Sequence, residues 1–377
     1  MLDVLNQMVQ SSGLAHLTVN NLIMICLACF FLYLGIKKEY EPYLMVPIAF
    51  GILLVNLPMA GLMDHPANGN PGGLLYYLYK GTSLGIYPPL IFLCLGASTD
   101  FGPLIANPKT ILLGGAAQVG IFLAFFLAIM LGMTPQEAAS VGIIGGADGP
   151  TAIYVTTKLA PDLLSTIALA AYSYMALVPI IQPFAIKLVT TKKERRIRMT
   201  YKAENVSQMT KILFPIIITL VAGFIAPISL PLVGFLMFGN LLRECGVLDR
   251  LSQTAQNELV NIISILLGLT ISIKMQADLF LNVQTLLIIV FGLLAFIMDS
   301  IGGVMFAKFL NLFRKEKINP MIGAAGISAF PMSSRVIQKM ATDEDPQNFI
   351  LMYAVGANVS GQIASVIAGG LLLAYFS

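Results

Sequence analysis

An aspartate surrounded by glycine and proline is the residue of this sequence best suited to bind a cation. Asp148 stands in GGADGPT, within an otherwise apolar stretch. Gly and Pro disfavour a helix interior by about 1 and 3 kcal/mol relative to Ala, so the helix should open here. Opened backbone at membrane depth offers free carbonyl oxygens beside the carboxylate. We expect a sodium site at Asp148. The alternative is an aspartate at the membrane surface that caps the helix starting at Pro150.

A second glycine- and proline-rich stretch, 319–341, carries further polar groups. Asn319 and Ser328 offer neutral oxygens, which suit a cation that must also leave, and Gly323 lies four residues after Asn319 on the same helical face. Arg335 has a permanent positive charge that suits a carboxylate and repels sodium. We expect an anion site at Arg335 beside the cation site. The alternative is that Arg335 extends to the membrane surface.

Three more polar residues stand in apolar segments. Asn358 lies among small residues of the last segment, which permit close helix contact or a local break. Tyr174 could donate a hydrogen bond or a proton, or could simply pack with a satisfied hydroxyl. Asp299 is another acid deep in an apolar run, and an ion-binding role and a structural role facing a cavity are both open.

Apolar segments must position these residues. Of the 377 residues, 57% are hydrophobic and 11% are charged, whereas soluble globular proteins carry about 25% charged residues. Helices of about 20 apolar residues cross roughly 30 Å of hydrocarbon. We therefore predict an all-α polytopic membrane protein, a single integral membrane domain over 1–377 with discontinuous helices. About ten apolar segments are expected, at 20–36, 43–63, 87–98, 110–133, 163–188, 211–227, 230–242, 257–274, 284–310 and 349–376.

The charged residues exclude some functions and suggest an orientation. The 22 basic and 19 acidic residues give a net charge of +3, which is too small for nucleic acid to be a partner. The 2 histidines and 4 cysteines leave little room for a histidine metal centre or a disulfide framework. The loop 191–202 is the strongest basic run, and such loops mark the cytoplasmic side. We expect a multi-pass protein in contact with lipid.

The two broken segments, 138–160 and 319–341, resemble each other at an offset of 181 residues. Six of nineteen aligned positions are identical, where composition predicts roughly one or two. Transporters often place their site where paired discontinuous helices meet. An odd number of predicted crossings separates the copies, which predicts an inverted repeat; similarity of two glycine-rich helices is the alternative. The identical pairs are Gly142/Gly323, Gly145/Gly326, Pro150/Pro331, Val155/Val336, Lys158/Lys339 and Ala160/Ala341.

Four strings of this sequence resemble the beta subunit of the biotin-dependent, sodium-translocating decarboxylases. They are GIIGGADGPTAIYVTTKLAP, AAYSYMALVPIIQP, NPMIGAAGISAFPMSSRV and GANVSGQIAS, and the resemblance runs over nearly the whole chain. In one departure, members of this family read Gly-Pro-Asn-Val where this chain reads Gly-Ala-Asn-Val around Asn358. Without the proline, the extent to which the last helix opens at Asn358 is left undecided. Asp299 is outside these motifs.

The resemblance implies a function and a set of partners. Members decarboxylate carboxybiotin on a carrier protein and couple this step to Na+ export with proton uptake. The implied cofactors are Na+ and a biotin that is carried by the partner. The implied partners are a biotin carrier protein, a carboxyltransferase subunit and a small membrane subunit of gamma or delta type. A homo-oligomer in the cell inner (plasma) membrane is expected. The acid that is decarboxylated is chosen in the carboxyltransferase, so this sequence does not identify it.

The matching motifs also imply roles for individual residues. Arg335, Tyr174 and Asp148 would be catalytic, with Arg335 drawing in the carboxylate of carboxybiotin and Tyr174 or a protonated Asp148 delivering the proton. The position of the biotin would be set by Arg335, Asn319 and Gly323. Sodium would bind at Asp148, Asn358, Ser328 and Asn319. A sodium-coupled secondary transporter, either a Na+/H+ antiporter or a Na+/organic-anion symporter, is the alternative that the residues alone permit.

Overall fold

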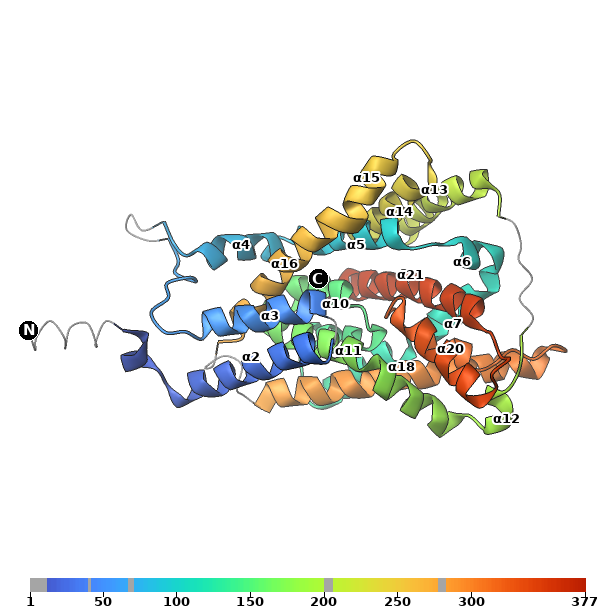
Figure 1. The fold of residues 1–377 in the computed structure, drawn as a ribbon, viewed down its shortest axis with the longest axis horizontal. Coiled ribbons are helices and arrows are strands. Elements are labelled where there is room, and N and C mark those ends of the chain that lie inside the picture. Colours follow the sequence, from blue (N-terminus) through green and yellow to red (C-terminus); the bar gives the residue numbers. More distant parts are fainter. Residues whose placement is uncertain (1–11, 40–41, 67–70, 200–205, 277–282) are drawn as a thin grey trace, which may run out of the picture.

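The described residues of this computed structural model are 12–39, 42–66, 71–199, 206–276 and 283–377, and they form helices and no strands. Six helices in these ranges are long and apolar enough to cross a membrane, or eight if two bent helix pairs are each counted as one span. The predicted all-α polytopic membrane protein is therefore confirmed. Figure 1 shows the long helices running roughly side by side.

The helix bounds are as follows. The helices of twelve residues or more are α2 (Val19–Lys37), α3 (Pro42–Val55), α5 (Tyr87–Ser98), α8 (Val119–Met130), α11 (Leu164–Val189), α13 (Gln208–Ile225), α14 (Leu230–Glu244), α16 (Val260–Ile271), α18 (Val283–Phe313), α20 (Met332–Glu344) and α21 (Leu351–Phe376). The shorter ones are η1 (Gly13–His16), α4 (Leu74–Ser83), α6 (Gly102–Ala106), η2 (Pro108–Thr110), α7 (Ile111–Ala116), α9 (Pro135–Gly142), η3 (Ile143–Gly146), α10 (Gly149–Leu159), η4 (Pro161–Leu163), α12 (Lys192–Arg195), η5 (Pro227–Ser229), α15 (Asp249–Thr254), η6 (Ala255–Leu259), η7 (Ser272–Lys274) and α19 (Met321–Ala324).

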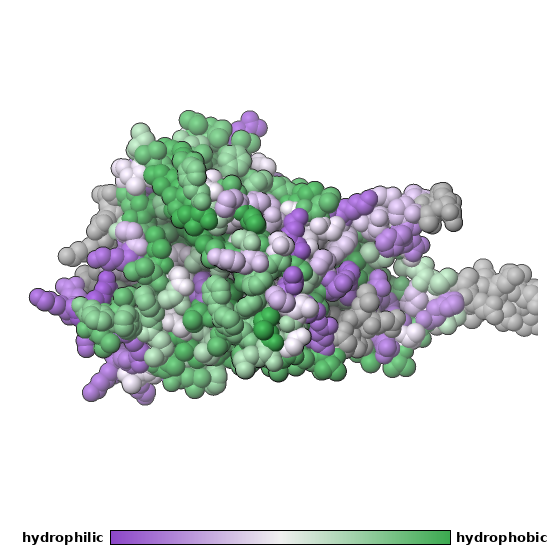
Figure 2. Space-filling view, turned by 180° about the vertical axis from the view of Figure 1, so that it is seen from behind, coloured by the Kyte–Doolittle hydropathy of each residue, from purple (hydrophilic) through white to green (hydrophobic). Residues whose placement is uncertain are grey.

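The surface is apolar along the middle of the molecule. Figure 2 shows hydrophobic residues over much of the face that it draws, with hydrophilic residues toward both ends of the molecule. Phe224 is 85% exposed and Met130 is 80% exposed. In water such a large exposed apolar area would be a liability, whereas in a bilayer it faces lipid.

The first broken segment follows the sequence signals closely. Thr134 and Glu137 form a capping box that starts α9, with Thr134 N donating to Glu137 Oε2 over 2.9 Å. After the short η3, Ala147 takes a left-handed conformation with φ of 51°. Asp148 is then extended and caps α10. The helix opens where the glycines and Pro150 predicted it.

The second broken segment has the same order of elements. Here α19 has four residues, the chain from 325 to 331 is irregular, and α20 begins at Met332. Each broken segment is followed by a helix of 26 residues, α11 after the first and α21 after the second, but α11 is bent by 70° after Met175 whereas α21 is a single span. The repeat and its inverted orientation both stay predictions.

Two spans differ in detail from the sequence-based expectation. Segment 110–133 is divided into α7 and α8, because the backbone N–H groups of Gly120 and Ile121 donate to Asp299 on α18. Segment 43–63 ends as a helix at Val55, where Asn56 donates to Ile52 O and Met275 O. Pro108–Met130 is nevertheless one candidate membrane span, as predicted, and only the short turn between α7 and α8 was not expected from the sequence.

The last helix stays continuous through Asn358. Helix α21 runs without a break from Leu351 to Phe376, so the small residues around Asn358 serve close packing and do not open the helix. A Cβ on Gly361 would lie 2.1 Å from Gly326 O, and one on Gly114 would lie 2.7 Å from Gly361 N. Main chain therefore contacts main chain where α21 meets α7 and the second broken segment.

Candidate functional site

The carboxylate of Asp148 is buried and receives hydrogen bonds from three parts of the chain. Thr151 N donates to Oδ1 over 3.2 Å, which is the N-cap bond of α10. Two hydroxyls donate to Oδ2, from Ser328 over 3.2 Å and from Ser365 over 2.8 Å. Asp148 is 5% exposed. The first broken segment, the second broken segment and α21 thus meet at one charged group.

The two broken segments are also joined through their main chains. Ser328 N donates to Gly146 O over 2.9 Å. Under the repeat offset of 181 residues, Ser328 is the equivalent of Ala147, the residue next to Gly146. The two openings of the backbone therefore touch at matching positions. One hydrogen-bonded crossing fixes both segments beside Asp148.

A small cavity lies beside the carboxylate. Its volume is about 40 Å³, and its lining includes Asp148, Ser328, Gln362, Phe92 and Phe330. A cavity needs roughly 10–15 Å³ to hold one water molecule. The space therefore suits an ion or one or two water molecules and is too small for a biotin ring system.

Three buried amide side chains around the crossing have oxygens without hydrogen-bond partners among the described residues. They are Gln118 Oε1, Asn358 Oδ1 and Gln362 Oε1. Gln118 Nε2 donates to Gly326 O over 3.1 Å, and Asn358 Nδ2 donates to Ile327 O over 2.7 Å. Leaving a buried polar group unpaired costs about 1–3 kcal/mol. These oxygens are chemically suited to a cation such as sodium.

The ligand set favours an alkali cation over a transition metal. Within the described ranges, no group of three or more His, Cys, Asp or Glu side chains is arranged to hold a metal ion. The oxygens near the crossing come from one carboxylate, two hydroxyls and neutral amides. Soft and transition metals prefer thiolate or imidazole ligands, whereas hard cations prefer oxygen.

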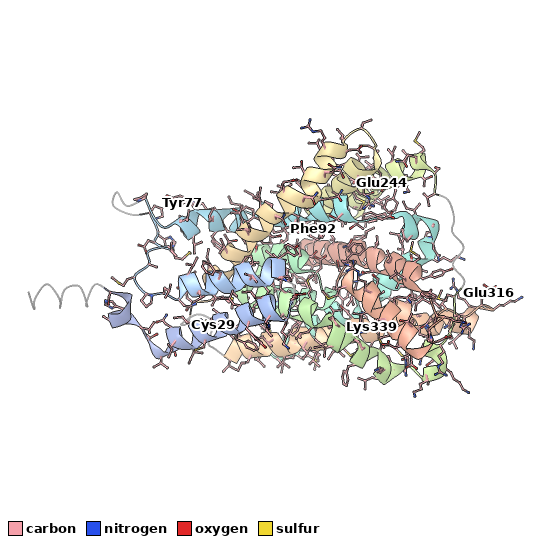
Figure 3. All side chains as sticks on the ribbon, in the orientation of Figure 1. Cys29, Tyr77, Phe92, Glu244, Glu316 and Lys339 are labelled. Carbon is pink, nitrogen blue, oxygen red and sulfur yellow. The ribbon has the colours of Figure 1, made fainter. Side chains whose placement is uncertain are left out.

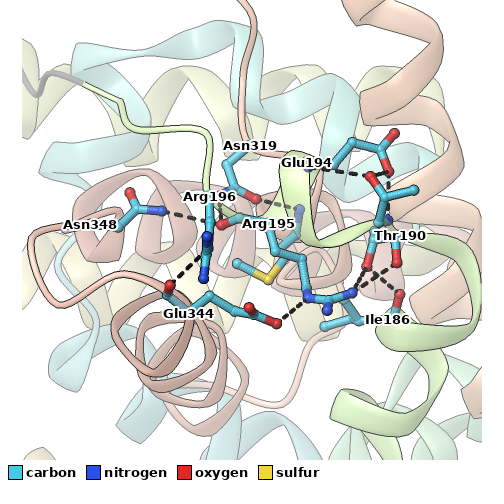
Figure 4. A network of polar contacts seen from close by, with 10 residues as sticks. Ile186, Thr190, Glu194, Arg195, Arg196, Asn319, Glu344 and Asn348 are labelled. Atoms are coloured by element: carbon cyan, nitrogen blue, oxygen red, sulfur yellow. Dashed lines mark hydrogen bonds and ion pairs between the residues drawn. The ribbon is translucent and has the colours of Figure 1, made fainter.

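Asn319 is placed away from the carboxylate in this conformation. Its Nδ2 donates to Arg195 O over 2.8 Å and to Ile197 O over 3.0 Å, and its Oδ1 accepts from Met321 N. Figure 4 shows Asn319 within the network around Arg195. Asn319 therefore attaches the basic loop to the second broken segment, and its role as a sodium or biotin ligand stays a prediction.

The same network ties the basic loop to the end of α20. Arg195 is 6% exposed and pairs with Glu344 over 2.7 Å, while Arg198 pairs with Asp345 over 2.7 Å. The hydrogen bond from Arg195 lowers the pKa of Glu344, and the hydrogen bond from Arg198 lowers the pKa of Asp345. The predicted loop 191–202 is thus docked through its residues up to 199; positions 200–202 lie outside the described residues.

Gly323 serves a close helix contact. A Cβ on Gly323 would lie 2.0 Å from Gly303 O on α18. Real Cβ atoms are essentially never that close to a backbone oxygen, so only glycine fits without a shift of α18 or α19. The residue positions the second broken segment, and a direct role in binding biotin stays a prediction.

The two tyrosines of α11 differ in what they contact. The hydroxyl of Tyr174 donates to Ile289 O on α18, and the ring lies against Gly292. The ring of Tyr172 lies against Gly149, where a Cβ would be 2.3 Å from the ring. Tyr172, and not Tyr174, is therefore the tyrosine that contacts the residue following Asp148. The proton-donor role predicted for Tyr174 requires that it first leave Ile289 O.

Arg335 is exposed on α20, one turn beyond the irregular stretch. Its backbone N–H bonds Pro331 O over 3.4 Å. Its guanidinium makes no hydrogen bond or ion pair with any residue that the structure describes, in contrast to the buried and paired Arg195. A free, permanently charged group beside the broken segment remains available to an anion.

Asp299 holds the interrupted helix. Its Oδ1 accepts from Gly120 N and from Ile121 N, the latter over 3.2 Å. Its Oδ2 is buried with no hydrogen-bond partner among the described residues, and a Cβ on Gly145 would lie 2.8 Å from it. Asp299 therefore links α18 to α8 directly behind the first broken segment. This placement agrees with the structural role that the sequence left open.

Sequence reasoning missed three polar residues near the crossing. Ser365 and Gln362 lie on α21, and Gln118 lies at the interruption between α7 and α8. Asn358, Gln362 and Ser365 are spaced i, i+4 and i+7, so they share one face of a helix. A polar stripe with this spacing in an apolar span was the signal that would have identified Ser365 and Gln362.

Comparison with known proteins connects this site to a family. Residues 20–376 match the family described as Na+-transporting oxaloacetate decarboxylase beta subunit. The methylmalonyl-CoA decarboxylase subunit beta of Propionigenium modestum is 53% identical, with 100% of both chains covered. The glutaconyl-CoA decarboxylase subunit beta of Acidaminococcus fermentans is 48% identical, with 98% of this chain and 97% of the relative covered. The oxaloacetate decarboxylase beta chain of Klebsiella pneumoniae is 45% identical, with 99% of each chain covered.

Proposed function

Because the chain belongs to the Na+-transporting oxaloacetate decarboxylase beta subunit family, we propose that it decarboxylates carboxybiotin on a carrier protein and couples this step to Na+ export with proton uptake. At the coarser level, the chain is a multi-pass membrane subunit of a sodium-transporting decarboxylase. The relatives act with three different acids by their names. The substrate of the complex therefore follows from its carboxyltransferase and not from this subunit.

The observation that carries the proposal is that three parts of the fold, the two broken segments and α21, meet at Asp148. The carboxylate belongs to the first broken segment, and its two hydroxyl donors come from the second broken segment and from α21. A movement of either broken segment would change the positions of the oxygen atoms that surround the ion. Binding and release of sodium would in this way be linked to the position of the repeats.

Sodium would bind where the two serine hydroxyls now donate to Asp148. A hydroxyl that turns its hydrogen away offers a lone pair to a cation. Ser365 has an alternative acceptor, because its Oγ also lies 3.0 Å from Gln362 O. Ser328, Asn358 and Gln362 would complete the oxygen set. The charge of sodium and that of Asp148 would then cancel within the membrane, where an isolated charge is costly.

Carboxybiotin would be held by Arg335. The carboxylate of the substrate carries a negative charge, and the exposed guanidinium of Arg335 has no partner among the residues that the structure describes. Arg335 lies on α20, the helix that begins directly after the second opening of the backbone. Its pairing with the substrate would thus act on the same segment that supplies Ser328 to the ion.

The chemical step releases CO2 and consumes one proton. The bond between the biotin nitrogen and the carboxyl carbon breaks, its electron pair stays on the nitrogen, and that nitrogen takes up a proton. Tyr174 could supply the proton from its Oη after leaving Ile289 O. Asp148 could supply the proton from its carboxyl group when sodium is absent, because a carboxylate within the membrane must be neutralised by either a sodium ion or a proton. Proton uptake and sodium export would then alternate at one group.

The partners follow from the same proposal. A biotin carrier protein would bring the carboxybiotin, a carboxyltransferase subunit would load it, and a small membrane subunit of gamma or delta type would join the complex, which we expect to contain several copies of this chain. The location would be the cell inner (plasma) membrane. The end of the molecule with the docked basic loop would face the cytoplasm, since basic loops stay on that side.

The test is Asp148→Asn in the purified complex, reconstituted in vesicles with carboxylated carrier protein. We expect loss of both sodium-stimulated decarboxylation and uptake of 22Na+. The matched control is Asp162→Asn, which changes an aspartate whose side chain is 93% exposed and whose one ion pair with the described residues is to Lys274. The control should retain both activities.

Two outcomes would contradict the proposal. Undiminished sodium dependence in Asp148→Asn would remove Asp148 from the ion site. Sodium flux that proceeds at the same rate without carboxylated carrier would favour the secondary transporter, since that alternative needs no decarboxylation. Replacing Arg335 with Met separates the two functions of the site further. It should reduce carboxybiotin turnover while binding of 22Na+ to the complex is retained.

A further inference from the structure

A basic pocket lies at the end of the molecule that carries the docked loop, apart from the Asp148 site. Two adjoining cavities of about 200 and 740 Å³ share the lining residues Asn107, Met199, Arg314, Ile318 and Tyr353. Neither Asp148 nor Arg335 lines either cavity. Figure 3 shows Glu316, which lies on the outer rim, at the end of the molecule opposite Tyr77.

Two asparagines, the buried Asn319 and the partly buried Asn311, hold both sides of the rim in place. Asn311 on α18 donates to Ile318 O over 2.8 Å and accepts from Ile318 N over 2.8 Å, which closes the loop 314–317. Asn319 donates to Ile197 O, and Asn319 N lies 3.3 Å from Met199 Sδ. The pocket is therefore a fixed feature of the fold, built where the basic loop meets the end of α18.

The rim has more positive than negative charge. Lys109, Arg314, Lys315 and Lys317 line the cavities, and none of them forms an ion pair with a described residue. Glu316 is the one carboxylate of the lining, and Arg198 is already paired with Asp345. A pocket with this excess charge attracts an anion.

The floor of the pocket is apolar and continues onto the surface that faces lipid. The inner cavity is lined by Leu112, Leu113, Leu310 and Ile322. Leu112 is 55% exposed, and on α18 next to the rim Phe313 is 76% exposed. A ligand that fills both cavities therefore needs an anionic end and a hydrocarbon part.

We propose that this pocket binds the phosphate group of an anionic phospholipid from the leaflet on the basic side, with an acyl chain lying along α7 and α18. Basic pockets between membrane helices on the cytoplasmic side are suited to anionic headgroups. A protein partner with an acidic face would meet the same charges, but it would not use the apolar floor that opens toward lipid. The bound lipid would connect η2 and α7 to the loop 314–317.

The experiment uses the purified complex and phospholipid of known composition. The complex is delipidated in detergent, and its melting temperature is measured on addition of dioleoyl-phosphatidylglycerol or of dioleoyl-phosphatidylcholine. Retained phosphorus per chain is measured in parallel. We expect phosphatidylglycerol to raise the melting temperature and to be retained, and phosphatidylcholine to do neither.

The double variant Arg314→Gln, Lys317→Gln should weaken the apparent affinity for phosphatidylglycerol roughly tenfold or more, because it removes two cations near the headgroup. The control variant Arg250→Gln, Lys187→Gln removes two cations that form no ion pair with described residues and lie outside the pocket. It should bind phosphatidylglycerol as the wild type does. Both variants should keep the sodium dependence of decarboxylation, since neither touches the Asp148 site.

Three outcomes would overturn the inference. The pocket variant could bind phosphatidylglycerol as tightly as the control variant. Inorganic phosphate or glycerol phosphate alone could reproduce the stabilisation, which would make the ligand a soluble anion. The pocket variant could retain phosphatidylglycerol but lose the copurifying soluble subunits, which would make the pocket a docking site for an acidic protein.

Discussion

Ser365 is the residue outside the broken segments that most directly shapes the environment of Asp148. It makes the shortest of the three hydrogen bonds to the carboxylate, 2.8 Å, and it comes from α21. A hydrogen bond to a charged group contributes about 1.5–3 kcal/mol. Ser365 thus connects Asp148, the centre of the proposed sodium site, to a continuous helix that packs against both broken segments.

Replacing Ser365 with Ala should raise the sodium concentration for half-maximal decarboxylation roughly tenfold, which corresponds to about 1.4 kcal/mol. The measurement is a sodium titration of decarboxylation by the complex, with binding of 22Na+ as a second readout. Ser98→Ala is the control, because the Ser98 hydroxyl bonds only Cys94 O within its own helix. An unchanged titration for Ser365→Ala would exclude Ser365 from the ion site.

Single residues were predictable where a side chain is out of place in its segment. Asp148 and Ser328 stand out in the sequence because a charge and a hydroxyl occur among glycines and prolines, and the structure brings them together. Asn319 stands out equally, yet its hydrogen bonds go to Arg195 and Ile197. The sequence does not show where an amide points, because that depends on a loop more than a hundred residues away in the chain.

Glycine contacts position the second broken segment at the scale of whole helices. Helix α19 has only four residues, so it has little hydrogen bonding of its own, and it lies against α18 through Gly323 and Gly303. Each of these glycines would place a Cβ about 2 Å from a backbone oxygen of the other helix, 2.0 Å from Gly303 O and 2.1 Å from Gly323 O. The close approach of two backbones therefore replaces side-chain packing here.

Replacing Gly323 with Ala should destabilise the protein by about 1–3 kcal/mol, because the added methyl group must push the helices apart. Gly115→Ala is the matched control, since a Cβ at Gly115 meets nothing within 4 Å. The control should be neutral or slightly stabilising, because Ala favours a helix more than Gly does. The measurement is thermal unfolding of the complex in detergent. Equal melting temperatures for the two variants would contradict the packing role of Gly323.

The docking of the basic loop on α20 should depend on pH through Glu344. The hydrogen bond from Arg195 lowers the pKa of Glu344 in the folded protein. A lowered folded pKa means that the stabilisation is fully present above the unfolded value of about 4.3 and is lost as the pH falls through the folded pKa. Glu344→Gln should therefore lower the melting temperature at pH 7.

The difference between wild type and Glu344→Gln should shrink as the pH falls from the unfolded value of about 4.3 through the lowered pKa of Glu344 in the folded protein, because the wild-type carboxylate loses its charge over this range. Asp343→Asn is the control, because Asp343 is exposed and forms no ion pair with any residue in the described ranges. A difference between wild type and Glu344→Gln that stays constant from pH 7 to pH 3.5 would show that the charge of Glu344 does not stabilise the docked loop.

The elements were predictable where propensity is strong. Gly and Pro located both broken segments, and the apolar runs located the long helices. The interruption between α7 and α8 was missed because its cause, Asp299, comes from another helix. The sequence likewise did not decide whether α21 stays continuous through Asn358, because Gly and Ala at a helix surface serve close packing as readily as a break.

At the scale of the molecule, composition alone identified a membrane protein, and the pattern of two similar broken segments located its centre. The described residues confirm the helical membrane fold and bring both broken segments to one carboxylate. The basic pocket was not predictable, because Lys109, Arg198 and Arg314 come from three distant segments. These positive charges lie close together only in the folded protein, where Asn311 holds the loop 314–317 and Asn319 holds the basic loop.

The hydrogen bond between Ser328 N and Gly146 O joins the two broken segments beside Asp148, so the proposed sodium site would lie between α9 on one side and α10 on the other. If sodium binds inside the membrane, the electrical work of moving it across is split between its arrival at the site and its departure. Moving one charge across the whole membrane against 100 mV requires about 2.3 kcal/mol. Arrival of sodium from one side and its departure to the other should each carry part of that energy, so that the membrane voltage acts on both halves of the cycle.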